Sequence, residues 1–226
     1  MSYYHDLNIR TLFTRRYNHL FLLLFWPIHG ILFYLLERVI PLQFHPVECA
    51  VDKYIPFCEY FIIPYYAWYV YMIGVLVILL LEDVEEFRSY MTFIIVSYTF
   101  TLLIYLIYPT SQHLRPASFD TQNLFTDMVQ NLYRVDTNTN VCPSLHVIGM
   151  MAASFAGWRI KVRYTVAWRA MWIVSAVAVC ASTVLLKQHS FVDVAAGMLV
   201  SVGAYYFVYI FLPRMPQKRD PERAAV

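Results

Sequence analysis

Six apolar segments follow one another along the chain, and short polar stretches separate them. A hydrophobic run of about 17–25 residues is long enough to cross a bilayer as a helix. The pattern therefore predicts six spanning helices. Their approximate bounds are residues 20–36, 60–81, 90–108, 141–158, 164–186 and 190–212.

The composition agrees with this pattern. Of 226 residues, 60% are hydrophobic and only 14% are charged, and the mean hydropathy is +0.51. So little polar material cannot cover a water-soluble globule of this size. A soluble enzyme, a disordered chain, a coiled coil and a nucleic-acid-binding domain are excluded, because each needs a charge density that this chain lacks.

The first apolar segment is predicted to be a retained helix. Arg10, Arg15 and Arg16 precede it, and no small-residue cleavage site follows it. We therefore expect an all-α bundle of six transmembrane helices at residues 20–212. A cytoplasmic segment at 1–19 precedes the bundle, and a cytoplasmic tail at 213–226 follows it. Glu82, Asp83, Glu85 and Glu86 predict a solvated inner loop.

The basic residues predict the orientation, because cytoplasmic loops of membrane proteins hold an excess of Lys and Arg. With both termini in the cytoplasm, the bias is strong. The inner residues are Arg10, Arg15, Arg16, Arg88, Arg159, Lys161, Arg163, Arg169, Arg214, Lys218, Arg219 and Arg223, and the outer ones are Arg38, Lys53, Arg115, Arg134 and Lys187.

Three polar clusters lie at the outer ends of the predicted spans, at residues 108–116, 142–146 and 182–193. Ionisable residues at membrane depth are costly, so such clusters indicate a functional site. A long outer loop, residues 109–140, separates the third and fourth segments. Cys49 and Cys58, on the outer side, are close enough in sequence to form a disulfide, although an unpaired outer thiol, Cys142, remains.

The second cluster is expected to bind an anion. In this topology the second, fourth and sixth helices begin outside, and free N–H groups and the helix dipole favour anions at such ends. Pro143 suits the first helical position, which leaves the amides of Ser144 and Leu145 at the entrance. Arg115 and Lys187 add positive charge, so the place suits a phosphate group.

The third cluster carries a candidate nucleophile. His189 and Asp193 are four residues apart, so they share one helix face. A carboxylate on one ring nitrogen fixes the tautomer and leaves the other nitrogen free to attack phosphorus. His146 comes from another helix and can protonate the leaving oxygen. Two histidines and a carboxylate can also bind zinc, but the neighbouring cations argue against a metal.

These residues resemble the type 2 phosphatidic acid phosphatase superfamily of membrane lipid phosphatases and phosphotransferases. Its signatures KxxxxxxRP, PSGH and SRxxxxxHxxxD correspond here to Tyr108-x6-Arg115-Pro116, Pro143-Ser144-Leu145-His146 and Ser182-Thr183-x5-His189-x3-Asp193. The resemblance covers residues 60–212. It implies a phosphohistidine on His189, an orienting Asp193, a general acid in His146 and phosphate contacts from Arg115 and Ser144, with no cofactor.

Three positions depart from the signatures. Tyr108 replaces a lysine, Leu145 a glycine and Thr183 an arginine, so two cationic phosphate ligands are missing. Lys187 lies one turn after Thr183 and compensates only in part, because an ammonium lacks the guanidinium fork. The branch that includes the sphingomyelin and inositol phosphorylceramide synthases also relaxes these positions while it keeps both histidines and the aspartate.

Three functions therefore remain open. The favoured one is dephosphorylation of a lipid phosphate at the extracytoplasmic face, and the runner-up is transfer of a phospholipid head group to an alcohol. A non-catalytic membrane scaffold is the third, although a decayed site has no physical reason to keep the nucleophile. Two further outer residues have simple interpretations: Glu59 as a helix cap and His113 as loop surface.

Overall fold

The computed structural model describes residues 3–40, 43–160 and 165–215, which are mostly helical, as the pattern predicted. The helices are α1 (Ile9–Leu12), α2 (Phe25–Arg38), α3 (Ile62–Glu82), α4 (Val84–Ile107), α5 (Leu124–Val135), α6 (Leu145–Arg159), α7 (Val166–Leu185) and α8 (Phe191–Tyr205). Short 3₁₀ segments lie at Asn18–Leu24, Ala50–Lys53, Glu59–Phe61 and Leu212–Arg214, and a π-helical stretch, Tyr206–Phe211, continues α8.

Five helical stretches are long and apolar enough to cross a membrane. They are Asn18–Arg38, Glu59–Glu82, Val84–Ile107, Val166–Leu185 and Phe191–Arg214. Each overlaps one of the predicted segments. The fifth was predicted to begin at Tyr164, which lies outside the described residues, as do Lys161, Arg163 and the tail residues Lys218, Arg219 and Arg223.

The remaining predicted span corresponds to α6, which is shorter than expected. It has 15 residues, or about 22 Å at 1.5 Å per residue, whereas a bilayer's hydrocarbon core is about 30 Å thick. The predicted start at Val141 was wrong, because residues 141–144 form the loop that leads into the helix. The count of six spans therefore stays a prediction.

Although it is short, α6 is the central helix of the bundle. It packs against α3, α4, α7 and α8. Two glycines allow this close approach: a Cβ at Gly149 would lie 2.6 Å from the Tyr98 hydroxyl, and one at Gly157 would lie 2.2 Å from the Trp172 ring. Only residues without a side chain fit there, so the sequence of α6 is shaped by its enclosure.

The turn between α3 and α4 is tighter than a solvated acidic loop. Only Asp83 separates the two helices, and its carboxylate caps α4 by accepting the Glu86 amide at 3.0 Å. Glu86 is buried, and its carboxylate binds Arg159 Nε of α6 at 2.9 Å. The predicted solvated loop is therefore wrong for Asp83 and Glu86, which are structural.

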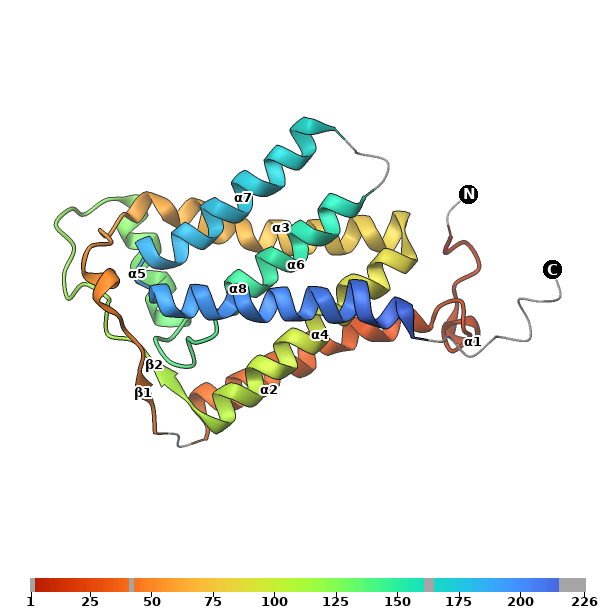
Figure 1. The fold of residues 1–226 in the computed structure, drawn as a ribbon, viewed down its shortest axis with the longest axis horizontal. Coiled ribbons are helices and arrows are strands. Elements are labelled where there is room, and N and C mark those ends of the chain that lie inside the picture. Colours follow the sequence, from red (N-terminus) through yellow and green to blue (C-terminus); the bar gives the residue numbers. More distant parts are fainter. Residues whose placement is uncertain (1–2, 41–42, 161–164, 216–226) are drawn as a thin grey trace.

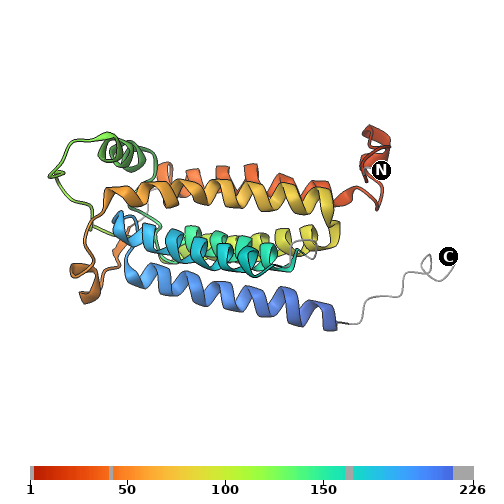
Figure 2. The same ribbon diagram turned by 90° about the horizontal axis from the view of Figure 1, so that it is seen from above.

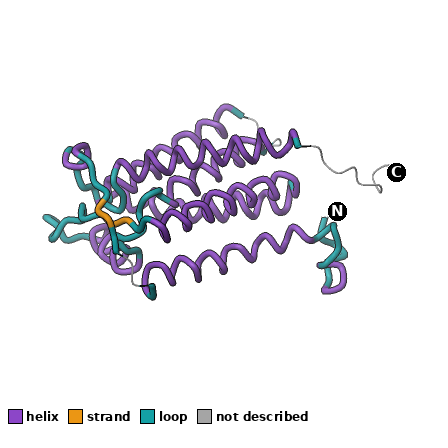
Figure 3. Tube along the Cα trace, turned by 60° about the horizontal axis from the view of Figure 1, so that its bottom comes forward, coloured by secondary structure: helices purple, strands orange, loops and turns teal. Residues whose placement is uncertain are grey.

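The loops that carry β1, β2 and α5 gather at one end of the bundle, and α1 with the N-terminal stretch lies at the other (Figures 1 and 2). β1 (His45–Pro46) pairs in parallel with β2 (Thr110–Ser111), with His45 opposite Thr110. Figure 3 shows these strands at the same end as the surrounding loops. The long loop contains α5, which the sequence did not predict; Asn123 caps it through the amides of Phe125 and Thr126. Which end faces the cytoplasm stays a prediction.

Candidate active site

His189 lies in the turn between α7 and α8, immediately before the residue that caps α8. Ser190 is that cap: its hydroxyl accepts the Asp193 amide, while the Asp193 carboxylate accepts the Ser190 amide at 2.8 Å. The same carboxylate oxygen lies 3.3 Å from His189 Nδ1. Both side chains are buried. The structure therefore brings the predicted pair together through Nδ1. The expectation that the two residues share one helix face is wrong, because His189 precedes the cap of α8 and only Asp193 is in the helix.

His146 is the second residue of α6 and reaches the same place from another direction. Its ring centroid lies 5.7 Å from that of His189. The rings of Tyr65 and Trp68 hold it, with centroids at 4.5 and 4.8 Å. Its Nε2 is buried and has no hydrogen-bond partner among the described residues. A nitrogen in this state is available to a ligand.

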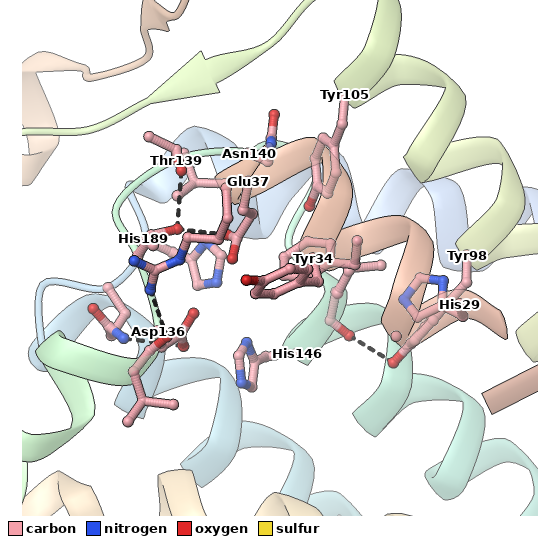
Figure 4. Close-up of a pocket in the computed structure, with 18 of the residues that line it drawn as sticks. His29, Tyr34, Glu37, Tyr98, Tyr105, Asp136, Thr139, Asn140, His146 and His189 are labelled. Atoms are coloured by element: carbon pink, nitrogen blue, oxygen red, sulfur yellow. Dashed lines mark hydrogen bonds between the residues drawn. The ribbon is translucent and has the colours of Figure 1, made fainter. Parts of the chain in front are cut away.

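Both histidines line one cavity of about 670 Å³. Figure 4 shows its polar end, with Glu37 and Asp136 near the two histidines. Asn140 also lines the cavity. Both polar side-chain atoms of Asn140 are buried without a partner in the described part of the chain. The cavity continues past Tyr98 and His29, deeper among the helices.

Asp193 and Ser144 join the beginnings of α6 and α8. Ser144 is the N-cap of α6, and its hydroxyl accepts the Val147 amide at 3.4 Å. Its own amide donates to the Asp193 carbonyl at 3.1 Å. The expectation that Pro143 would be the first helical residue, with the Ser144 amide free for an anion, is therefore wrong. Leu145 and His146, the first two residues of α6, both line the cavity, and amides at these positions have no acceptor within the helix.

Arg115 is turned toward protein groups beside the site. Its guanidinium donates to the carbonyls of Tyr133 and Asp136, at 3.1 and 2.7 Å, and to Gln188 Oε1 at 2.5 Å. It also lies over the Tyr133 ring, 4.3 Å from the centroid. Burial lowers the pKa of Arg115 from its usual value, although nearby Asp136 opposes the shift. Arg115 orients the neighbour of His189 and does not line the cavity.

Lys187, Thr183 and Tyr108 also lie outside the lining. The Lys187 ammonium donates to the carbonyls of Asp52, at 3.1 Å, and Ile55, and burial lowers its pKa while Asp52 opposes that shift. The Thr183 hydroxyl donates to the Cys180 carbonyl at 2.8 Å. Tyr108 is exposed, with its ring stacked on His45. Their role as substrate ligands stays a prediction.

Sequence reasoning missed the charged residues that do line the cavity, Glu37, Arg38 and Asp136. Glu37 Oε1 accepts the Thr137 hydroxyl at 2.5 Å. Asp136 Oδ2 accepts the Tyr65 hydroxyl at 2.5 Å and Gln188 Nε2 at 3.1 Å. One signal was present: Glu37 and Arg38 directly follow the first apolar segment, where an ionisable residue indicates function.

Sequence reasoning also missed Asp52, which is bonded to the backbone just after His189. Its carboxylate is buried and accepts the amides of Phe191 and Cys49, both at 2.8 Å.

Cys49 and Cys58 are free thiols. Within the described residues, no three His, Cys, Asp or Glu side chains converge in a way that could hold a metal ion.

Comparison with known proteins identifies the family. The model of the PAP2 superfamily matches residues 32–207, most of the chain, so the chain belongs to this superfamily. Neither the curated proteins nor the solved structures contain a significant match. Members of this superfamily are generally phosphoesterases, and membership in it, together with the five apolar helical stretches, supports a membrane protein of the lipid phosphatase or phosphotransferase type.

Proposed function

We propose that this chain is an integral membrane lipid phosphate phosphatase that acts at the extracytoplasmic face through a phosphohistidine on His189. The observation that carries the proposal is the His189–Asp193 contact beside His146, whose ring lies 5.7 Å from that of His189 at the same cavity. Membership of the superfamily supports the same chemistry.

The geometry supports a two-step reaction. His189 Nε2 attacks phosphorus, the P–O bond to the lipid breaks, and His146 supplies a proton to the departing oxygen. Water then attacks phosphorus, the P–N bond to His189 breaks, His146 takes the proton from the water, and phosphate leaves. Asp193 keeps the His189 Nδ1 proton in place and stabilises the charge that develops on the ring. The amides that begin α6 stabilise the phosphoryl oxygens.

A second candidate, transfer of a phospholipid head group to an alcohol, is favoured by the charges of the cavity. Two carboxylates, Glu37 and Asp136, line it beside one cation, Arg38, while Arg115 and Lys187 are bonded to carbonyls elsewhere. A phosphate monoester dianion is repelled more by the Asp136 carboxylate than a singly charged phosphodiester is. In this reaction an alcohol replaces water in the second step.

The products distinguish the two reactions. Purified protein is incubated with a lipid monophosphate, and separately with a phospholipid and an alcohol. Free phosphate from the first supports the phosphatase; diacylglycerol with a new phosphodiester from the second supports the transferase. Formation of neither product by folded protein contradicts both enzymes and favours the scaffold.

The phosphohistidine is tested with a matched pair of variants. His189→Ala is expected to abolish turnover and the acid-labile phosphoenzyme. His113→Ala is the control, because His113 is an exposed loop histidine beside Glu48, and it should leave both unchanged. Turnover that survives in His189→Ala would contradict the assignment of the nucleophile.

A further inference from the structure

The cavity that holds the two histidines extends well beyond them, along one face of α2. Trp26, Gly30, Tyr34 and Arg38 follow one another at intervals of four residues and all line it. The face is apolar at Trp26 and charged at Glu37 and Arg38, a distance of about 16 Å at 1.5 Å per residue. A ligand that fills the cavity must therefore be polar at one end and apolar at the other.

The cavity is open to the outside of the bundle where this face of α2 lines it. Tyr34 of α2 is 60% exposed and Tyr69 of α3 is 48% exposed, although both line it. Gly30 is also exposed, and a Cβ there would meet no atom within 4 Å. Both helices belong to stretches that are long and apolar enough to cross a membrane. An opening between such helices gives access from the hydrocarbon region.

Three polar atoms without hydrogen-bond partners lie in the part of the cavity near His146. His29 Nδ1, Trp26 Nε1 and Trp68 Nε1 are buried with no hydrogen bond to any described residue, and all three side chains line the cavity. His29 is 8% exposed, and its ring lies 5.0 Å from that of Tyr98. Buried polar groups without partners are costly, so they are expected where a ligand supplies the missing bonds.

These atoms lie close to the proposed phosphate position without belonging to it. The Tyr98 hydroxyl donates to the Leu145 carbonyl, next to His146, at 3.1 Å. Trp68 packs on the His146 ring, and Trp26 packs edge-on against Tyr98. The three side chains therefore line the part of the cavity next to the His146 and Tyr98 rings.

We propose that this part of the cavity is a binding site for the linkage region and the chain of a lipid phosphoester. The lipid enters sideways between α2 and α3, its chain lies along Gly30, and its ester or amide oxygens bind His29, Trp26 and Trp68. This inference rests on the proposed function for the position of the phosphate. It means that residues outside the phosphoryl-transfer site select the length of the lipid chain and its linkage.

The chain site is tested with two glycine variants. Gly30→Leu places a side chain in the cavity, whereas Gly74→Leu is the control, because Gly74 lies on α3 with equally open space and does not line the cavity. Gly30→Leu is expected to raise KM for a long-chain lipid phosphoester about tenfold and to leave a short-chain, water-soluble analogue within about twofold. Gly74→Leu should change neither. Equal loss for both substrates, or no loss for either, would overturn the chain site.

The linkage site is tested with His29→Phe, which keeps a flat ring and removes both nitrogens. Binding of an ester-linked lipid should weaken about fivefold, the loss expected for one buried hydrogen bond. An ether-linked analogue lacks the carbonyl oxygen and should bind the variant as well as it binds the unchanged protein. Equal weakening for ester and ether lipids would contradict the linkage site. If His29→Phe does not fold, Trp26→Phe takes its place.

The binding measurements separate this inference from the proposed function. In addition to KM, lipid binding is measured on the His189→Ala protein with and without Gly30→Leu or His29→Phe, because His189→Ala cannot turn lipid over. If the unchanged chain cleaves no phosphoester, the proposed function fails, while retention of long-chain lipid that Gly30→Leu weakens still supports the site. If turnover is observed but Gly30→Leu binds lipid normally, the proposed function stands and the inference fails.

Discussion

The two histidines of the site are held in opposite ways. His189 is held by hydrogen-bonding groups, which we call its polar frame: Asp193 contacts its ring, and the Thr183 carbonyl accepts its amide at 3.0 Å. Its neighbours are fixed too, since Lys187 binds the loop carbonyls and Phe191 donates to Asp52. His146 instead lies between the rings of Tyr65 and Trp68, with Nε2 unbonded to any described residue.

This difference agrees with the two proposed roles. A nucleophile must present one nitrogen in one tautomer, which hydrogen bonds can fix. A general acid must exchange its proton with the substrate, and a permanent partner on the exchanging nitrogen would compete with that step. We therefore expect His189 to lose activity when a hydrogen-bonding neighbour is replaced. We expect His146 to lose activity when an aromatic ring that packs against it is removed.

The largest effect is expected at the polar frame. Asp193→Asn keeps the size of the side chain but can donate to Nδ1, which leaves His189 Nε2 protonated and unable to attack. Turnover should fall about 10³–10⁴-fold, as when a triad carboxylate becomes an amide. Asp127→Asn, in the first turn of α5 and outside the cavity, is the control. Phosphoenzyme formation at an unchanged rate in Asp193→Asn would show that the tautomer is not fixed by this contact.

A smaller loss is expected when the acid is removed. His146→Ala should reduce turnover of an alkyl phosphoester about 10²–10³-fold, the usual contribution of a general acid. With a leaving group that departs without protonation, such as a nitrophenol, the first step should recover and the phosphohistidine should accumulate. The same loss for both leaving groups would place His146 outside the proton transfer.

The core of this comparison was predictable from the sequence, because it rests on local spacing. His189 and Asp193 are four residues apart, and Ser190 with Asp193 forms a capping box that fixes α8. His146 lies two residues after Ser144, which caps α6. Helix beginnings with these residues are recognisable in a chain of apolar segments, so three residues of the site and most of the bundle were accessible.

The rest depends on contacts between distant parts of the chain. Asp52 bonds to Phe191, 139 residues further along the chain, and Glu37 bonds to Thr137, 100 residues further along. Arg115 and Lys187 were expected at the phosphate because their charge suits it, but backbone carbonyls bind both. Charge in a sequence does not say which acceptor a flexible side chain finds. The start of α6 was misjudged because Val141 and Cys142 are apolar and extend the hydrophobic run in the sequence, although they lie in the loop before the helix.

A moderate effect is expected at Asp52, which holds the turn without touching the ring. Asp52→Ala removes the acceptor of the Phe191 amide, so the His189 turn should become less ordered. We expect kcat to fall about tenfold with little change in KM, because a positioning group lost at the nucleophile affects chemistry more than binding. Glu48→Gln, which alters the acceptor of the His113 amide in the same region, is the control. A change in KM alone would contradict a positioning role.

The smallest effect is expected at the hydroxyl of Tyr65, and it sharpens the comparison most. Tyr65→Phe deletes the bond to Asp136 but keeps the ring against His146, so turnover should fall only about threefold to tenfold, the value of one hydrogen bond. Tyr65→Leu removes the flat ring as well and should cost clearly more, with both variants compared for thermal unfolding. If Tyr65→Phe were as damaging as Asp193→Asn, the hydroxyl and Asp136 would form a second polar frame, and His146 would be held by hydrogen bonds as His189 is. A loss in Tyr65→Leu alone would show that packing suffices to position an acid whose nitrogen must stay free.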